Sequence, residues 1–316
     1  MLQKIEIVIP VLKTKKSDLN RLLSSILNQS PLNYSNINIL VVLNPAYAAE
    51  ALQFESNLKS VLKFPDFISL TVFPSESRGV NAARQLGLQH CTSEIVFFFD
   101  DDVVLNDSTL TANHVEQHLK NTGLFAIGGS YHNDEIKTQF ALVYLRRQIR
   151  WINEAYTDSS RTGVAYLLGG HFSIKRSLLQ TANLGFDKSI LFGSSETEFF
   201  MSARSKGLKL QLFKFSVQHH IIDGSLRLMQ KTFLQGRGKR YIESKNLLFQ
   251  PIYKSIVINC SVFESVVERI FEFCFFLGYY SFDGNYSGFF KMHFQKINLA
   301  FKHQKQKVIN SIRSGL

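Results

Sequence analysis

Strand-like and helix-like segments alternate along the first hundred residues of this chain. Apolar runs typical of buried strands lie at residues 5–9, 37–43, 68–73 and 95–99, and segments with helical spacing of apolar residues separate them. Strands that alternate with helices in this way predict a doubly wound, mostly parallel sheet. The alternation therefore restricts the first third of the chain to an α/β architecture.

The last of these runs, Ile95–Phe99, is followed directly by three aspartates, Asp100, Asp101 and Asp102. Five consecutive apolar residues predict a strand buried on both faces, and open α/β sheets bind ligands beyond the carboxyl ends of such strands. Three carboxylates at one strand end repel one another unless a cation lies between them, and Mg²⁺ and Mn²⁺ prefer oxygen ligands and bridge phosphates. The alternative interpretation is a solvated acidic turn.

The composition indicates a globular protein with an anionic partner. The chain has 316 residues, of which 45% are hydrophobic, which suffices for a large core. The formal net charge of +11 suits nucleic acid, anionic lipid or nucleotide-phosphate ligands. Three scattered cysteines have neither metal-binding nor disulfide-framework spacing, and no signal peptide is visible. We therefore expect a reducing, cytoplasmic location.

The C-terminal region, residues 226–316, has a helical and increasingly basic pattern. Its last stretch, from Lys291 to Arg313, carries basic residues with hardly any acid. The aromatic segment at residues 266–282 is interrupted by charges and is too short to span a bilayer, so it predicts an interfacial or buried amphipathic helix. Together these segments favour peripheral association with an anionic cytoplasmic membrane surface. The alternative is an aromatic helix packed on the core, with solvated lysines.

Four sequence blocks, in this order, resemble family-two glycosyltransferases of the GT-A fold. The blocks are Ile-Val-Ile-Pro at 7–10, Arg-Gly-Val-Asn-Ala-Ala-Arg at 78–84, Phe-Asp-Asp-Asp at 99–102, and Gly-Gly-His-Phe-Ser-Ile-Lys-Arg at 169–176 leading to Phe-Gly-Ser-Ser-Glu-Thr-Glu at 192–198. The resemblance covers about residues 5–225. It implies a nucleotide-sugar-binding half at residues 1–105, an acceptor-binding half at 106–225, and inverting transfer that depends on Mn²⁺ or Mg²⁺.

The resemblance also implies which residues bind the donor and the metal. In the family's D-x-D motif, Asp100 would face the nucleotide ribose, Asp102 would ligate the metal that bridges the diphosphate, and Asp101 would be a helper. One of His219 and His220 would complete the metal shell. The remaining candidates for donor binding are Pro10, Val11, Asn44, Arg78, Arg84, Gly170 and His171.

Two of these candidates have alternative interpretations. Asn44 stands where the family usually has an acidic residue for the base, but Asn44 followed by Pro45 is also a good helix N-cap. The identity of the base therefore stays open, although a UDP-sugar is favoured. Arg84 suits a phosphate, but it could equally pair with a nearby carboxylate in a structural bridge.

Glu196 falls on the family's general-base position and would deprotonate the acceptor hydroxyl. Ser195 and Glu198 have the spacing of a capping box, so we assign Glu198 mainly to capping. The basic, glycine-containing stretch at residues 235–240 is similar to a flexible loop that closes over the diphosphate in relatives. These features imply a saccharide or lipid-linked saccharide acceptor, in cell-envelope or surface polysaccharide synthesis, and no nucleic-acid partner.

Two other functions remain as alternatives. A nucleotidyltransferase that makes nucleotide sugars would need a glycine-rich basic loop after the first strand, and residues 11–16 contain lysines but no glycine. A non-catalytic module that uses the positive charge on nucleic acid or membrane would not need Asp100, Asp102 and Glu196.

Overall fold

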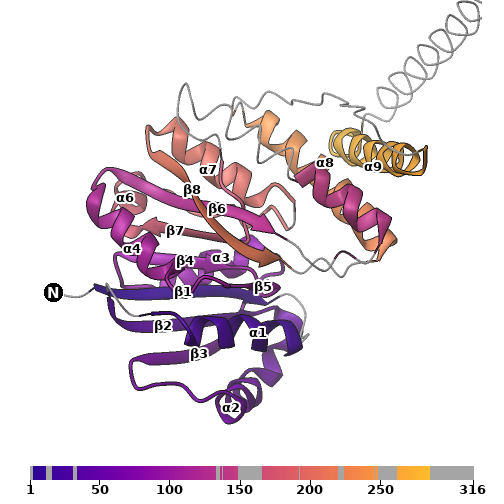
Figure 1. The fold of residues 1–316 in the computed structure, drawn as a ribbon. Coiled ribbons are helices and arrows are strands. Elements are labelled where there is room, and N and C mark those ends of the chain that lie inside the picture. The colour runs from indigo at the N-terminus through magenta and orange to yellow at the C-terminus, as the bar shows by residue number, and fades with distance from the viewer. Residues whose placement is uncertain are drawn as a thin grey trace, which may run out of the picture.

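An eight-stranded mixed sheet forms the centre of the described structure (Figure 1). This computed structural model describes residues 3–11, 16–30, 34–132, 136, 138–148, 166–191, 193–219, 224–245, 247 and 262–284. The strand order is β3-β2-β1-β4-β7-β6-β8-β5. The strands are β1 (Gln3–Val11), β2 (Tyr34–Leu43), β3 (Ile68–Pro74), β4 (Ile95–Phe99), β5 (Val103–Val104), β6 (Leu124–His132), β7 (His171–Lys175) and β8 (Lys209–His219).

The first four strands pair in parallel with one another, as the alternation of strands and helices predicts. The second half of the sheet is mixed, because β7 runs antiparallel to both β4 and β6 while β8 runs parallel to β6. The short strand β5 pairs antiparallel with β8 and places Val103 opposite His219. This last pairing matters for function, since it brings the end of β8 beside the three aspartates.

Helices cover both faces of the sheet. They are α1 (Lys16–Leu27), η1 (Pro45–Glu50), α2 (Ala51–Val61), α3 (Val80–His90), α4 (Leu110–Lys120), α6 (Arg176–Thr181), α7 (Ser195–Ser205), α8 (Ser225–Ser244) and α9 (Val262–Ser281), and residues 139–148 are also helical. Helix α7 ends just before Gly207, which has the positive φ of 80° that a helix-terminating glycine adopts. The helical segment that begins at Pro45 is interrupted within η1, where Tyr47 has non-helical dihedrals.

Strand β4 is apolar throughout because both of its faces are buried. Phe97 and Phe99 belong to the core cluster formed with α1, α2 and α4, whereas Phe98 belongs to the cluster formed with α3, α6 and α7. Successive side chains of a strand point to opposite faces, so a strand between two layers of helices needs an apolar residue at every position. The polar residues that follow it therefore mark the edge of the core.

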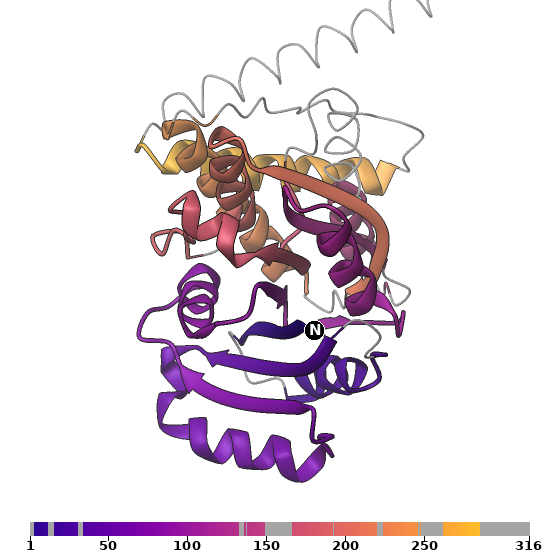
Figure 2. The ribbon, with the colours of Figure 1, turned by 90° about the vertical axis from the view of Figure 1, so that its left-hand side faces the viewer.

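The C-terminal helices α8 and α9 pack closely against each other, at the end of the molecule opposite β3 and α2 (Figures 1 and 2). A Cβ atom on Gly236 would lie 1.9 Å from the carbonyl oxygen of Phe275, and one on Gly278 would lie 1.9 Å from that of Phe233. Glycines that allow two backbones to approach explain why residues 235–240, which were predicted as a flexible loop, are instead helical within α8. The loop prediction is therefore wrong.

A third core cluster joins these helices to the helical residues 139–148. Tyr144, Leu228 and Phe271 are buried in it, and the guanidinium of Arg147 lies 2.8 Å from a carboxylate oxygen of Glu268. Within the described ranges, no helix has both the length and the apolar character to cross a membrane. Trp151 and the basic residues 285–316 lie outside those ranges, so the predicted membrane-binding tail stays a prediction.

Candidate active site

The three aspartates form the turn between β4 and β5, at the carboxyl edge of the parallel half of the sheet. The backbone N–H of Asp100 donates a hydrogen bond to the carbonyl of Gly170, 3.1 Å away. The N–H of Val103 donates to the carbonyl of Asp100 at 3.3 Å, which closes the turn. Burial, the charges of its two neighbours and the more distant Asp18 raise the pKa of Asp101 well above its ordinary value. This tight turn therefore holds three carboxylates that repel one another.

Asp102 pairs with His219 across the β5–β8 ladder. The Nε2 atom of His219 lies 3.3 Å from Oδ1 of Asp102. Burial acts to raise the pKa of Asp102, but the adjacent imidazole outweighs it and the pKa is lowered. Conversely, burial acts to lower the pKa of His219, and the carboxylate reverses this and raises it. The two side chains thus form a polarised pair at the end of two strands that are far apart in sequence.

Arg84 connects the aspartate turn to the opposite side of the site. Its Nη2 atom donates to Oδ1 of Asp100 at 2.8 Å and to the carbonyl of Gly169 at 2.9 Å. Its side chain is only 2% exposed, whereas Asp100 keeps 30% of its side chain exposed. Burial raises the pKa of Asp100, although the guanidinium opposes this. The contacts support the carboxylate-pairing interpretation of Arg84 over a direct phosphate contact.

Glu196 lies in the first turn of α7, on the far side of Arg84 from Asp100. Its Oε2 atom lies 3.9 Å from Nη1 of Arg84 and accepts a hydrogen bond from the hydroxyl of Ser195 at 2.7 Å. Its side chain is 28% exposed, so it can meet a ligand. A Cβ atom on Gly169 would lie 3.0 Å from the Glu196 carboxyl carbon and 3.1 Å from Nη2 of Arg84, so this residue packs directly against both side chains. Arg84 and Gly169 thus bring Asp100 and Glu196, 96 positions apart in the chain, to one site.

Tyr131 also belongs to this site, and sequence reasoning missed it. Its hydroxyl oxygen accepts a hydrogen bond from the backbone N–H of Gly170, and its ring centroid lies 4.8 Å from that of His219. Burial, then Asp100 and Glu196, raise the pKa of the phenol well above its ordinary value. Tyr131 is the penultimate residue of β6, which ends at His132. The Gly-Gly-Ser-Tyr segment has no apolar alternation, so only the strand pairing shows this role.

The remaining candidates lie in several environments. Pro10 and Val11 are buried at the end of β1, and Arg78 is exposed before α3. Asn44 is the N-cap of η1, as the capping interpretation predicts, with its Oδ1 accepting from the N–H of Ala46 at 3.1 Å. His171 is fully buried, and its ring lies near those of His114 and Tyr131.

Of the two adjacent histidines predicted as metal ligands, His219 and His220, the structure describes only the first. His219 is the last residue of β8 and reaches Asp102, whereas His220 lies outside the described residues. The metal-ligand role of either histidine stays a prediction, but the geometry of His219 suits it.

The predicted capping box at the start of α7 is wrong. The helix is preceded by Ser194, which has a left-handed φ of 58° and makes no side-chain cap, and the hydroxyl of Ser195 bonds to Glu196 instead. Glu198 is buried and accepts hydrogen bonds from Lys245 at 2.7 Å and from Ser202 at 3.1 Å. Its carboxylate therefore binds α7 to the end of α8.

The residues present fit a divalent metal at the aspartate turn. A carboxylate and an imidazole 3.3 Å apart can contact one ion, and Mn²⁺ accepts both kinds of ligand. No cluster of three or more such side chains suited to a metal occurs among the described residues. Two protein ligands are the expected number where the phosphates of a bound nucleotide supply the others, as is usual for Mg²⁺ sites.

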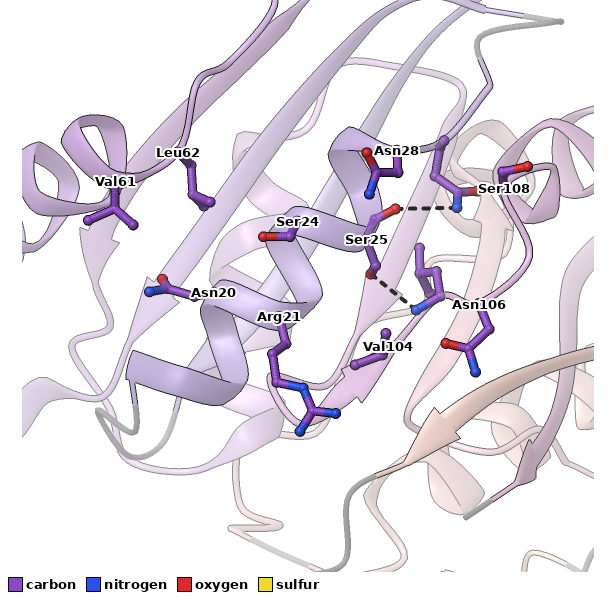
Figure 3. Close-up of a pocket in the computed structure, with 12 residues that line it drawn as sticks. Asn20, Arg21, Ser24, Ser25, Asn28, Val61, Leu62, Val104, Asn106 and Ser108 are labelled. Carbon is purple, nitrogen blue, oxygen red and sulfur yellow. Dashed lines mark hydrogen bonds between the residues drawn. The ribbon is translucent and has the colours of Figure 1, made fainter. Parts of the chain in front are cut away.

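A separate hollow of about 590 Å³ lies between α1, the end of α2 and the segment that follows β5 (Figure 3). Asn20 and Arg21 of α1 and Asn28 just after it line the hollow, together with Val61, Val104 and Asn106. The hydroxyl of Ser25 accepts from the N–H of Leu105 at 3.1 Å in its wall. No residue of the aspartate site lines this hollow, so we do not place the chemistry there.

A mixed sheet with an aspartate turn after its fourth strand and an acidic helix start across from it defines a protein of the GT-A class. The sequence model described as Glycosyl transferase family 2 matches residues 6–182, and the chain belongs to this family. A search of curated proteins found no match.

Solved structures share the fold at low sequence identity. The mannosyltransferase PcManGT from Pyrobaculum calidifontis, in complex with GDP-Man and Mn²⁺, has a TM-score of 0.61 at 15% identity, covering 95% of this chain and 81% of that one. Glucosyl-3-phosphoglycerate synthase from Mycobacterium tuberculosis, with Mn²⁺, UDP and phosphoglyceric acid, has a TM-score of 0.54 at 13% identity, covering 79% and 80%. S. aureus TarS 1-349 with UDP-GlcNAc has a TM-score of 0.51 at 15% identity, covering 88% and 73%.

Proposed function

We propose that this glycosyltransferase is an inverting, metal-dependent enzyme that moves a sugar from a nucleotide-diphosphate donor to a hydroxyl acceptor. The observation that carries the proposal is the convergence of Asp100, the Asp102–His219 pair and Glu196 around Arg84. The three structural relatives are described with Mn²⁺ or with a nucleotide or nucleotide sugar, which supports a donor of this kind.

In this proposal Asp102 and His219 hold Mn²⁺ or Mg²⁺, which when bound neutralises the charge that develops on a departing nucleoside diphosphate. Asp100, fixed by Arg84, faces the ribose. Glu196 accepts the proton of the acceptor hydroxyl. Arg84 keeps the donor-side and acceptor-side carboxylates at a fixed separation, because it contacts Asp100 and Gly169 directly and lies beside Glu196.

The acceptor proposal rests on the C-terminal sequence. Basic residues from Lys291 to Arg313 and aromatic residues in α9 suit a lipid-linked or envelope saccharide at an anionic membrane surface.

A nucleotidyltransferase or a non-catalytic basic module is less well supported, because the chain belongs to a glycosyltransferase family and has the acidic residues that transfer requires.

The test is a donor screen on the full chain. Purified protein is incubated with UDP-glucose, UDP-GlcNAc, UDP-galactose and GDP-mannose, with Mn²⁺ or with EDTA, and the release of nucleoside diphosphate is measured. We expect slow, Mn²⁺-dependent hydrolysis of one donor and faster release when a saccharide acceptor is added. If none of these nucleotides binds or is cleaved, the proposal is wrong.

A further inference from the structure

Tyr131 lies in the candidate active site but has no part in the mechanism above. It is near the C-terminal end of β6, and its phenolic oxygen accepts the backbone N–H of Gly170. Its ring contacts His219, and the ring of His171 lies 6.3 Å away between centroids. The ring is therefore fixed on one side by His219, and the hydroxyl is fixed by Gly170.

Two adjacent glycines show what lies on either side of this hydroxyl. A Cβ atom on Gly170 would stand 2.2 Å from the Tyr131 hydroxyl oxygen, and one on Gly169 would stand 3.0 Å from the Glu196 carboxyl carbon. The Gly169–Gly170 turn thus has Tyr131 beside one residue and Glu196 beside the next. The same turn accepts the N–H of Asp100 through the Gly170 carbonyl.

The phenolic proton has no partner within the described part of the chain. The oxygen uses a lone pair to accept from Gly170, and no described group accepts a hydrogen bond from Tyr131. A phenol has one proton to donate, and this proton can turn toward an acceptor supplied by a ligand. Asp100 and Glu196 are the two charged groups that act on it most strongly.

The transferred sugar has to occupy this region if Glu196 is the base. In an inverting reaction the base and the leaving group stand on opposite sides of the anomeric carbon. The leaving diphosphate would lie at the Asp102–His219 pair, which Tyr131 contacts through its ring, and Glu196 lies across the Gly169–Gly170 turn from the Tyr131 hydroxyl.

We infer that Tyr131 is a donor-sugar-binding residue, whose hydroxyl donates a hydrogen bond to an oxygen of the transferred sugar. This inference rests on the proposed function. A site that supplies a fixed hydrogen-bond donor to a substrate hydroxyl discriminates against sugars that lack it, because the polar group is then left unpaired. Tyr131 would therefore contribute to the choice of sugar rather than to the choice of nucleotide.

The test compares binding of a nucleoside diphosphate with binding of its sugar. Affinities for UDP and UDP-GlcNAc, and for GDP and GDP-mannose, are measured by calorimetry with Mn²⁺ for the parent and for Tyr131→Phe. We expect the affinity for the nucleoside diphosphate to stay within about twofold, and the affinity for the sugar nucleotide that the parent prefers to fall by about three- to tenfold, the effect of one neutral hydrogen bond.

Two further variants make the result decisive. Gly170→Ala keeps the tyrosine but moves its hydroxyl, because a Cβ at Gly170 would stand 2.2 Å from the oxygen and 2.7 Å from two carbons of the tyrosine ring. We expect the same selective loss of affinity for the sugar nucleotide, so this variant decides between the outcomes if Tyr131→Phe does not fold. Tyr144→Phe removes a phenolic hydroxyl that accepts from Gln235 at 3.1 Å in the third core cluster, and it should bind both ligands as the parent does.

The outcomes separate the inference from the function on which it rests. Equal weakening of nucleoside diphosphate and sugar nucleotide would mean that Tyr131 only supports the site, and would overturn the inference alone. An unchanged preference for the sugar nucleotide in both site variants would do the same. A parent protein that binds no nucleotide would overturn the proposed function, and the inference with it.

Discussion

Lys245, the residue that follows α8, places its Nζ atom 2.7 Å from Oε1 of Glu198 in the first turns of α7. The same ammonium lies 2.5 Å from Oδ2 of Asp187. The two carboxylates raise the pKa of Lys245 against the effect of its burial. This contact joins the C-terminal helices to the helix that carries the proposed base, so α8 is part of the structure that positions Glu196.

We expect Lys245→Met to destabilise the protein by on the order of 1–3 kcal/mol. The variant leaves the Glu198 carboxylate, 5% exposed, with the Ser202 hydroxyl but without its charged partner, and the loss of a hydrogen bond to a buried charged group costs about this much. Urea unfolding measures the effect. Lys59→Met is the matched control, because it removes an exposed (i, i+4) pair with Glu55 and should change the stability by less than about 0.5 kcal/mol. Equal effects of both variants would contradict the assigned role.

Asp102→Ala should abolish Mn²⁺-dependent nucleotide binding while leaving the fold intact. The residue lies in a turn at the sheet edge with 30% of its side chain exposed, so little of the core depends on it. Calorimetry with UDP and Mn²⁺ measures the binding, and a thermal melt without ligand checks the fold. A variant that binds nucleotide and metal as well as the parent would remove Asp102 from the proposed metal site.

Glu196→Gln should lower the transfer rate by roughly 10²–10⁴-fold, the usual contribution of a general base, with donor affinity nearly unchanged. Glutamine keeps the size of the side chain and can still accept the hydroxyl of Ser195, but it cannot take a proton. Steady-state kinetics with a saccharide acceptor measure this.

Glu198→Gln provides the comparison for Glu196→Gln. Because Glu198 binds Lys245 and does not cap α7, we expect this variant to lower the melting temperature more than it lowers the catalytic rate of the folded enzyme. Equal losses of rate in both variants, with unchanged melting temperatures, would show that the two glutamates share one role.

The stability of the protein should fall as the pH drops below about 6.5, through buried histidines. Burial lowers the pKa of His118 and of His171 to about 3. Histidine in an unfolded chain has a pKa of about 6.5, so between these values the unfolded chain binds protons that the folded chain does not. The stabilisation is therefore fully present above pH ~6.5 and is lost as the pH falls toward 3.

The variant that tests this is His118→Gln. The Nε2 atom of His118 lies 2.9 Å from the hydroxyl of Ser173, and the glutamine amide can retain a contact there without titrating. Unfolding free energies are measured at pH 7.5 and pH 5. We expect a smaller difference between the two values in the variant than in the parent, and an equal difference would contradict the prediction.

The sequence by itself determined the strand–helix alternation, the all-apolar strand β4 and the aspartates that follow it. These are local patterns: residues 95–99 are apolar because both faces of β4 are covered, and the polar residues start where the cover ends. The blocks around Arg84 and Asp100, which lie within the family match over residues 6–182, and the block around Glu196 beyond it also suggested the family to which the chain belongs.

Only the tertiary structure decided how distant residues meet. The pairing of β5 with β8 brings His219 to Asp102. The pairing of β7 with β4 brings Gly170 to Asp100, and the pairing of β7 with β6 brings Gly170 to Tyr131. The role of Glu198 was misassigned because a capping-box spacing is a local signal, whereas its partner Lys245 lies 47 positions away. The glycines of residues 235–240 suggested a loop, whereas the contact between α8 and α9 shows the close backbone approach that Gly236 allows. Such contacts depend on which faces of the helices and strands pack together. The spacing of residues within one helix or strand does not identify the element that packs against it.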